Sequence, residues 1–101
     1  MIRNVVMGKL REAPDEAAAA ADREQLQRGL DGIAHLQLPG QLATLLGTDA
    51  GLKDGAWSFA ITNDWLDAES YRAYDTDPEH NEYRALIGGV CSQLARVQFE
   101  V

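Results

Sequence analysis

The chain has 101 residues, 46% hydrophobic and 25% charged, which is ordinary for one globular domain, and we expect a single domain over residues 1–101. A formal net charge of −7 argues against nucleic acid or an anionic membrane as a partner. The lone cysteine, Cys91, excludes an intrachain disulfide, and no stretch resembles a signal peptide or a membrane span, so the expected location is the cytoplasm.

The first half of the chain predicts a strand, a long helix and a second strand. Residues 2–10 are rich in β-branched and apolar types on both faces of the predicted strand. Residues 14–35 carry an acidic first turn, an alanine run and an apolar stripe with helical spacing. Gly29 and Gly32 weaken this helix and indicate either a close approach to the sheet, which is favoured, or a bend. Residues 41–47 form the next predicted strand, and the glycine-containing residues 48–55 connect it to another strand.

The second half predicts a strand, a broken helix and a last strand. Residues 57–63 alternate between large apolar and small side chains, which is the period of a strand. Asp67 is placed to cap a helix, on which Tyr71 and Tyr74 share one face. Asp77 and Pro78 end that helix, and a second helical piece runs from 78 to about 86. Residues 91–101 end in strand-like alternation.

The resulting order, β-α-β-β-α-β, predicts an α+β ferredoxin-like sandwich in which helices cover one face of a four-stranded antiparallel sheet. The other face would expose apolar side chains such as Val5 and Met7. A symmetric homodimer that stacks two open sheet faces would cover them.

Four segments carry a resemblance to a known family: I-R-N-V-V-M-G-K-L at the start, W-S-F-A-I-T-N-D-W in the middle, Y-D-T-D-P-E-H from Tyr74 to His80, and V-Q-F-E-V at the end. Over nearly its whole length the chain resembles the stress-responsive A/B barrel (Dabb) family of the dimeric α/β-barrel superfamily. The resemblance implies a small homodimer whose paired sheets form a barrel, with no cofactor. Most members of this family have no settled biochemical role.

The resemblance also implies a site. A plant member of the family is a cofactor-free polyketide cyclase, and its working tyrosine and histidine correspond to Tyr74 and His80. His80 would then remove a proton next to a carbonyl, and Tyr74 would hydrogen-bond the carbonyl oxygen. Asn4, Val6 and Tyr71 are expected to line the ligand pocket. Asn4 stands where the cyclase has another histidine, and an amide cannot exchange protons as imidazole does, which weakens the transfer of cyclase activity.

The residues alone favour a plainer role for the same pair, in which His80 bonds to a backbone carbonyl and Tyr74 fills the core. Helix caps and turns account for the many acidic residues, so no metal site is predicted. Two functions remain. The favoured one is a stress-related or ligand-binding homodimer that takes a small apolar or aromatic molecule. The alternative is a cofactor-independent enzyme, cyclase-like or monooxygenase-like, that uses His80 and Tyr74; a pocket large enough for a bicyclic compound would favour it.

Overall fold

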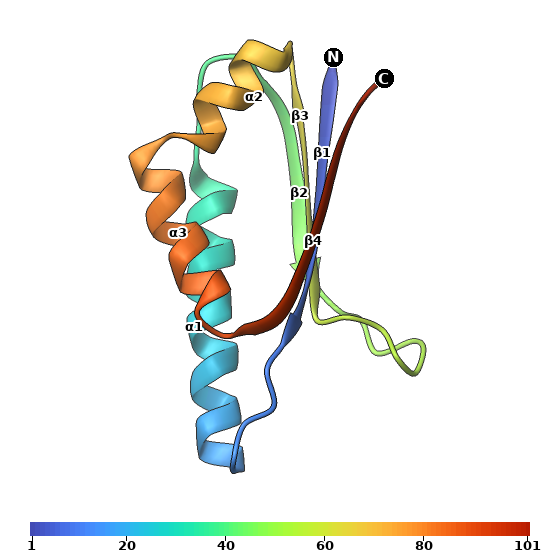
Figure 1. Ribbon diagram of the computed structural model, residues 1–101, viewed down its shortest axis with the longest axis vertical. Helices are drawn as coiled ribbons and strands as arrows, with labels where there is room; N and C mark the ends of the chain where they lie inside the picture. Colours follow the sequence, from blue (N-terminus) through green and yellow to red (C-terminus); the bar gives the residue numbers. More distant parts are fainter.

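The computed structural model describes all residues 1–101 and contains one sheet and three helices. The elements are β1 (Ile2–Leu10), α1 (Glu16–His35), β2 (Gln41–Thr48), β3 (Phe59–Trp65), α2 (Ala68–Asp75), α3 (Pro78–Gly88) and β4 (Cys91–Glu100). The strands pair antiparallel in the order β2-β3-β1-β4. All three helices lie on one side of the sheet (Figure 1), which confirms the predicted ferredoxin-like arrangement. None of the helices combines the length and the apolar character that a membrane span requires.

An aspartate begins each helix. Asp15, Asp67 and Asp77 are the N-caps of α1, α2 and α3, and each carboxylate accepts a hydrogen bond from the backbone N–H three residues later, at 2.8, 2.8 and 2.9 Å. These bonds satisfy N–H groups that have no partner within the helix. The cap predicted at Asp67 is therefore confirmed, and Pro78 directly after Asp77 stands where its missing N–H costs nothing.

The third strand lies two residues later than the sequence suggested. It was expected at residues 57–63 and is found at Phe59–Trp65, where Phe59 pairs with Gly8 and Trp65 with Ile2. Trp57 is half-buried before the strand begins, whereas Trp65 is completely buried. The alternation of large side chains continues through Asn63 to Trp65, and the pairing partners on β1 decide where it starts and ends.

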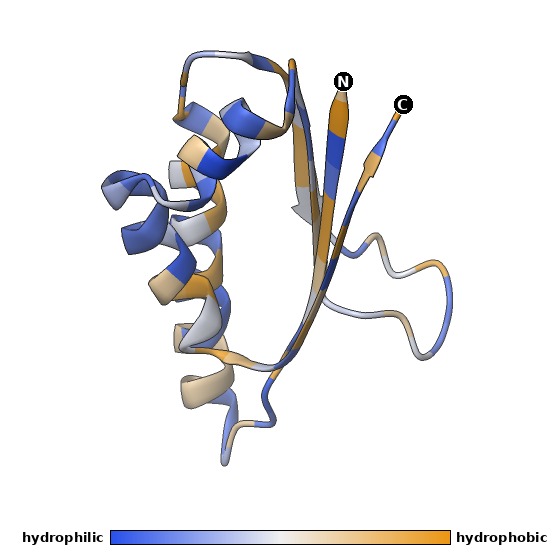
Figure 2. Cartoon of the chain, turned by 45° about the horizontal axis from the view of Figure 1, so that its top comes forward, coloured by the Kyte–Doolittle hydropathy of each residue, from blue (hydrophilic) through white to orange (hydrophobic).

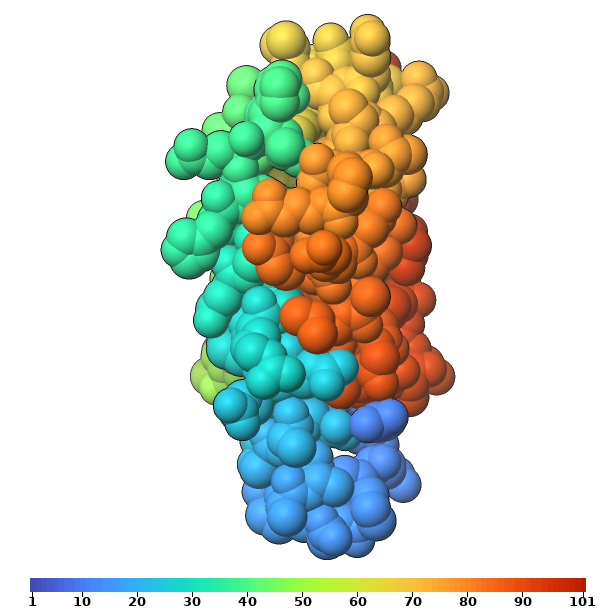
Figure 3. All heavy atoms as spheres, turned by 90° about the vertical axis from the view of Figure 1, so that its left-hand side faces the viewer, coloured from blue at the N-terminus to red at the C-terminus, as the bar shows by residue number.

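The core lies between the helices and the sheet. Its larger part packs one face of α1 and the end of α3 against β3, and its buried members are Leu26, Leu30, Ile33, Phe59, Ile61, Ile87 and Val90. Figure 3 shows α1 and α3 side by side over the sheet. A Cβ on Gly32 would overlap the ring of Tyr83, and one on Gly29 would lie 2.6 Å from Ile87. The prediction that these glycines approach the sheet is thus wrong, because the close neighbour is α3.

The opposite face of the sheet is bare. Four large apolar side chains on it are exposed: Met7 by 43%, Leu45 by 75%, Val97 by 53% and Phe99 by 43%. Alternation along paired strands places them together, with Val5 opposite Val97. No helix lies on this side in Figure 1 or Figure 2, and only the loop between β2 and β3 extends beyond it. We refer to these five residues as the open face.

Candidate functional site

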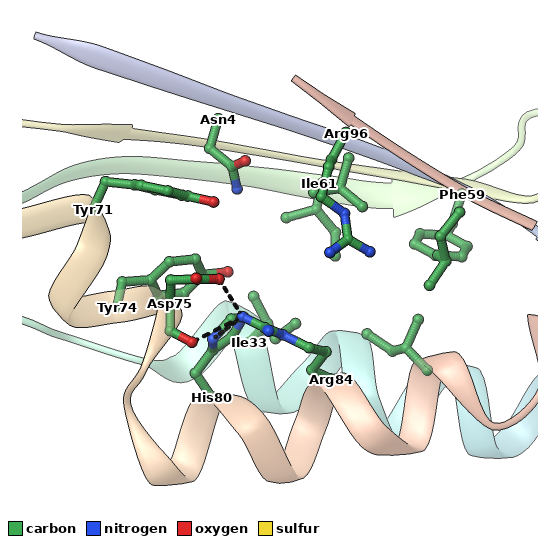
Figure 4. A pocket seen from close by; sticks show the side chains of 13 residues that line it. Asn4, Ile33, Phe59, Ile61, Tyr71, Tyr74, Asp75, His80, Arg84 and Arg96 are labelled. Atoms are coloured by element: carbon green, nitrogen blue, oxygen red, sulfur yellow. Dashed lines mark hydrogen bonds and ion pairs between the residues drawn. The ribbon is translucent and has the colours of Figure 1, made fainter. Parts of the chain in front are cut away.

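A small cavity lies between the helix-covered face of the sheet and helices α2 and α3. Its volume is about 60 Å³, and it is lined by all five residues that the sequence singled out: Asn4, Val6, Tyr71, Tyr74 and His80 (Figure 4). Apolar side chains complete most of its wall, namely Ile33, Phe59, Ile61, Ile87 and Leu94. The fold therefore brings the predicted residues together in one place, while their roles stay a prediction.

The break between α2 and α3 brings His80 onto Tyr74. Tyr74 is on the last full turn of α2, and Pro78 starts α3 in a new direction after the Asp77 cap. His80 lies in the first turn of α3, with its backbone N–H bonded to the Asp77 carboxylate at 2.9 Å. The imidazole stacks on the Tyr74 ring with centroids 3.8 Å apart and planes inclined by 28°. The Tyr74 ring also contacts the indole of Trp65, with centroids 4.6 Å apart.

Buried amides connect the sheet to Tyr74. Asn63 accepts hydrogen bonds from Trp65 Nε1 at 2.8 Å and Asn4 Nδ2 at 3.0 Å, and its own Nδ2 donates to the Tyr74 hydroxyl oxygen at 3.2 Å. Gln98 donates to Asn4 Oδ1 at 2.9 Å. Asn4 and Asn63 are only 3% and 2% exposed, and both ends of the Asn4 amide are hydrogen-bonded, as buried polar groups usually are. The sequence analysis did not single out Asn63, although it is the polar residue on the large-side-chain face of β3.

His80 is neutral at physiological pH. Its ring is buried, and burial together with the positive charge of Arg84 lowers its pKa from 6.5 to about 4, although hydrogen bonding to the Tyr74 backbone and the nearby acidic residues Asp75 and Asp77 partly oppose this. Nη2 of Arg84 lies 3.3 Å from Nδ1 of His80. The two protons of this nitrogen also serve the carboxylate and the carbonyl of Asp75, so Arg84 acts on His80 through its positive charge. Such an imidazole is a weak base at neutral pH.

Both tyrosines of the cavity are protonated donors. Burial raises the pKa of Tyr74 above its usual value, and the bond from Asn63 and the charge of Arg84 only partly oppose this effect. Burial also raises the pKa of Tyr71, with a smaller contribution from the negative charge of Asp75. Phenols in this state carry a proton that a bound molecule can accept.

The mouth of the cavity carries charges that the sequence analysis did not assign to the site. The half-exposed Asp75 and Arg84 pair across the α2–α3 break at 2.5 Å, and Arg84 also donates to the Asp75 carbonyl at 3.0 Å. Arg96 on β4 is exposed and makes no ion pair. One uncompensated positive charge thus stands beside an apolar cavity in a protein of net charge −7. Only the register of β4 against β1, which sets Arg96 opposite Val6, could have placed it there.

No group of three or more histidine, cysteine, aspartate or glutamate side chains is placed to hold a metal ion. Cys91 packs half-buried against the main core, and burial raises the pKa of its thiol. The polar groups of the cavity are therefore one amide, two phenols, one carboxylate, one imidazole and two guanidinium groups.

Comparison with known proteins gives structural neighbours but no match in sequence: no family model matches the chain, and neither does any curated protein. A dimeric ferredoxin-like protein of unknown function from Thermobifida fusca is similar, at 25% identity and a TM-score of 0.81, over 99% of this chain and 90% of that one. A Dabb family protein from Mesorhizobium loti has 15% identity and a TM-score of 0.71, over 99% and 95% of the two chains. SnoaB, a cofactor-independent oxygenase from Streptomyces nogalater, has 16% identity and a TM-score of 0.67, over 99% and 91%.

These neighbours define the class of the protein. It is a small α+β protein with the ferredoxin-like fold found in the Dabb protein and in the dimeric ferredoxin-like proteins. The resemblance to the Dabb family that the sequence indicated is confirmed in the fold.

Proposed function

We propose that the protein is a homodimer that binds a small, mostly apolar molecule in the cavity between the sheet and helices α2 and α3. The observation that carries this proposal is the convergence of Tyr71, Tyr74, His80 and Arg96 on one cavity whose walls are mostly apolar. Binding sites for small molecules combine apolar walls with a few polar groups that orient the ligand.

The open face supports the homodimer. Contiguous apolar surface of this kind is typical of a protein–protein interface, and a two-fold dimer would bury it against its own copy. The similar proteins from Thermobifida fusca, Bacteroides fragilis and Jannaschia are each described as dimeric. We expect Val97→Glu to shift the protein to monomer in sedimentation velocity, because the charge would enter the middle of this face. Arg28→Glu, on the exposed side of α1, is the matched control and should leave the sedimentation unchanged. A dimer that tolerates Val97→Glu would exclude this interface.

Binding is favoured over proton-transfer catalysis for two reasons. The pKa of about 4, set by burial and by the charge of Arg84, makes His80 a poor base at neutral pH. The cavity of about 60 Å³ is also well below the roughly 150 Å³ of a cavity that admits benzene. A bicyclic substrate would need side chains to move before it could enter.

A second candidate function is a cofactor-independent enzyme, cyclase-like or monooxygenase-like. The stacking of His80 on Tyr74 inside a cavity supports it, as does the shared fold with SnoaB, which is described as a cofactor-independent oxygenase. In this reading Tyr74 would hydrogen-bond the carbonyl oxygen of the substrate, and His80 would exchange the proton.

Tryptophan fluorescence tests the ligand site. In Trp57→Phe, the buried Trp65 beside Tyr74 is the only remaining tryptophan, so its emission reports on the cavity. We expect saturable changes with propionate, butyrate or butanone. Leu94→Phe should weaken them because Leu94 lines the cavity, whereas Leu52→Phe on the exposed β2–β3 loop should not. Equal responses in Leu94→Phe and Leu52→Phe, or no response in Trp57→Phe itself, would show that the cavity is not the ligand site.

A further inference from the structure

We infer that Trp65 fixes the direction of the hydrogen bonds that end at Tyr74, and that the cavity therefore selects ligands carrying a hydrogen-bond acceptor oxygen. Trp65 would act as a positioning residue, since it acts through Asn63 and Tyr74. The choice of ligand rests on the proposed binding function, whereas the direction of the hydrogen bonds does not.

The indole of Trp65 sets the direction of these hydrogen bonds. An amide side chain can turn to present either oxygen or nitrogen, but the indole N–H of Trp65 can only donate. It lies 2.8 Å from Asn63, so the oxygen of that amide must face it. The nitrogen of Asn63 then faces the Tyr74 hydroxyl at 3.2 Å and donates to its oxygen.

The neighbouring amides follow the same direction. Asn4 places its nitrogen 3.0 Å from the oxygen of Asn63, and its own oxygen accepts from Gln98 at 2.9 Å. Reversing the direction of these hydrogen bonds would turn the amide groups of Asn4, Asn63 and Gln98. It would also set the nitrogen of Asn63 against the indole N–H of Trp65. Two donors would then face each other between residues that are 2% and 0% exposed, where no water replaces the lost bond.

The consequence appears at Tyr74. Its hydroxyl oxygen accepts from Asn63, and no hydrogen bond donated by that hydroxyl occurs within the protein. The oxygen points into the cavity in Figure 4. Its raised pKa keeps the proton in place at neutral pH. A bound molecule therefore meets a donor and must bring an acceptor, and the unpaired charge of Arg96 at the mouth favours a carboxylate over a ketone.

The direction can be tested without any ligand. In a NOESY spectrum of the ¹⁵N-labelled native protein, we expect the side-chain amide protons of Asn63 to show cross-peaks to the Tyr74 ring. Those of Asn4 should show cross-peaks to the indole proton of Trp65, because both groups donate to one oxygen. Cross-peaks from the Asn63 amide protons to the indole proton, in place of the tyrosine ring, would overturn the inference.

Trp65→Phe tests the effect on binding, with Trp57→Phe as the matched control. Without the indole N–H, Asn63 is free to turn and take the Tyr74 proton for itself. We expect propionate, followed by chemical shifts, to bind about 2- to 10-fold more weakly to Trp65→Phe and to Tyr74→Phe, the loss of roughly one neutral hydrogen bond. Trp57→Phe should bind as the native protein does.

The outcomes separate the two proposals. If Trp65→Phe folds, as its backbone amide spectrum would show, and binds propionate normally, the positioning role is wrong. If neither propionate nor butanone binds the native protein but the expected cross-peaks are observed, the direction of the hydrogen bonds is confirmed and the proposed binding function is wrong. Tighter binding of butylamine, a donor of similar size, than of either acceptor would overturn the selectivity.

Discussion

Acidification should destabilise the protein through His80. The pKa of His80 is lowered from 6.5 to about 4 in the folded protein, chiefly by burial and then by Arg84. Between these two pH values the unfolded chain binds the proton and the folded one does not. The stabilising effect of the neutral ring is thus complete above pH 6.5 and is lost as the pH falls toward 4.

The size of the effect follows from the gap of about 2.5 in pKa. At about 1.4 kcal/mol for each unit of pKa, the free energy of unfolding falls by roughly 3 kcal/mol in all, and by roughly 2 kcal/mol between pH 7 and pH 5. Little of this is screened by solvent, because the ring is 5% exposed. The carboxylates with lowered pKa, Asp22, Asp64 and Asp67, start from 3.8 and lose their charge only at lower pH.

Urea unfolding at pH 7, 6 and 5, followed by tryptophan fluorescence at one fixed protein concentration, measures this loss. His80→Gln should be less stable at pH 7 but should show almost no further loss down to pH 5. His35→Gln, which changes the exposed histidine at the end of α1, should keep the full pH dependence. A native protein whose stability is flat from pH 7 to 5, or a His80→Gln variant with the native slope, would refute the reasoning.

Two further predictions concern Arg84 and the sheet. Arg84→Met should raise the pKa of His80, because it removes the positive charge that is the second-largest cause of the lowering. An NMR titration of the His80 ring protons measures this pKa, and an unchanged value would contradict the role of Arg84. Gly8→Ala should destabilise the protein by about 1 to 3 kcal/mol, since its Cβ would overlap the Phe59 ring, whereas Gly47→Ala meets open space; urea midpoints that are equal for the two would contradict this packing.

Much of the fold could be predicted because it is encoded locally. Asp67 and Pro78 mark helix starts by their own hydrogen-bonding chemistry, and alternation marks the strands. Features that depend on a partner element were harder to place. The ends of β3 follow from its pairing with β1, and the neighbour of Gly32 follows from how α3 packs across α1. Neither the pairing of β3 with β1 nor the packing of α3 against α1 can be read from the neighbouring residues in the sequence.

The site was predictable only in part, for the same reason. Tyr74 and His80 stand out because they flank a helix break, and the family resemblance added Asn4, Val6 and Tyr71. Asn63 bonds to Tyr74 from β3 and Arg96 reaches the cavity from β4, and only the strand register places them there. Arg84 lies one turn after His80 on α3, so its spacing in the sequence could have indicated it. The low pKa of His80 is likewise set by burial and by Arg84.

The most direct test of the account is a titration of the native protein with propionate and butanone, observed through the ring signals of Tyr74 and His80 at pH 7. A binding site in the cavity predicts saturable shifts of both rings and of the Val6 methyl groups, with propionate the tighter ligand because of Arg96. Shifts confined to the open face, or rings that stay unchanged up to high concentrations of both compounds, would show that Tyr74 and His80 only fill the interior.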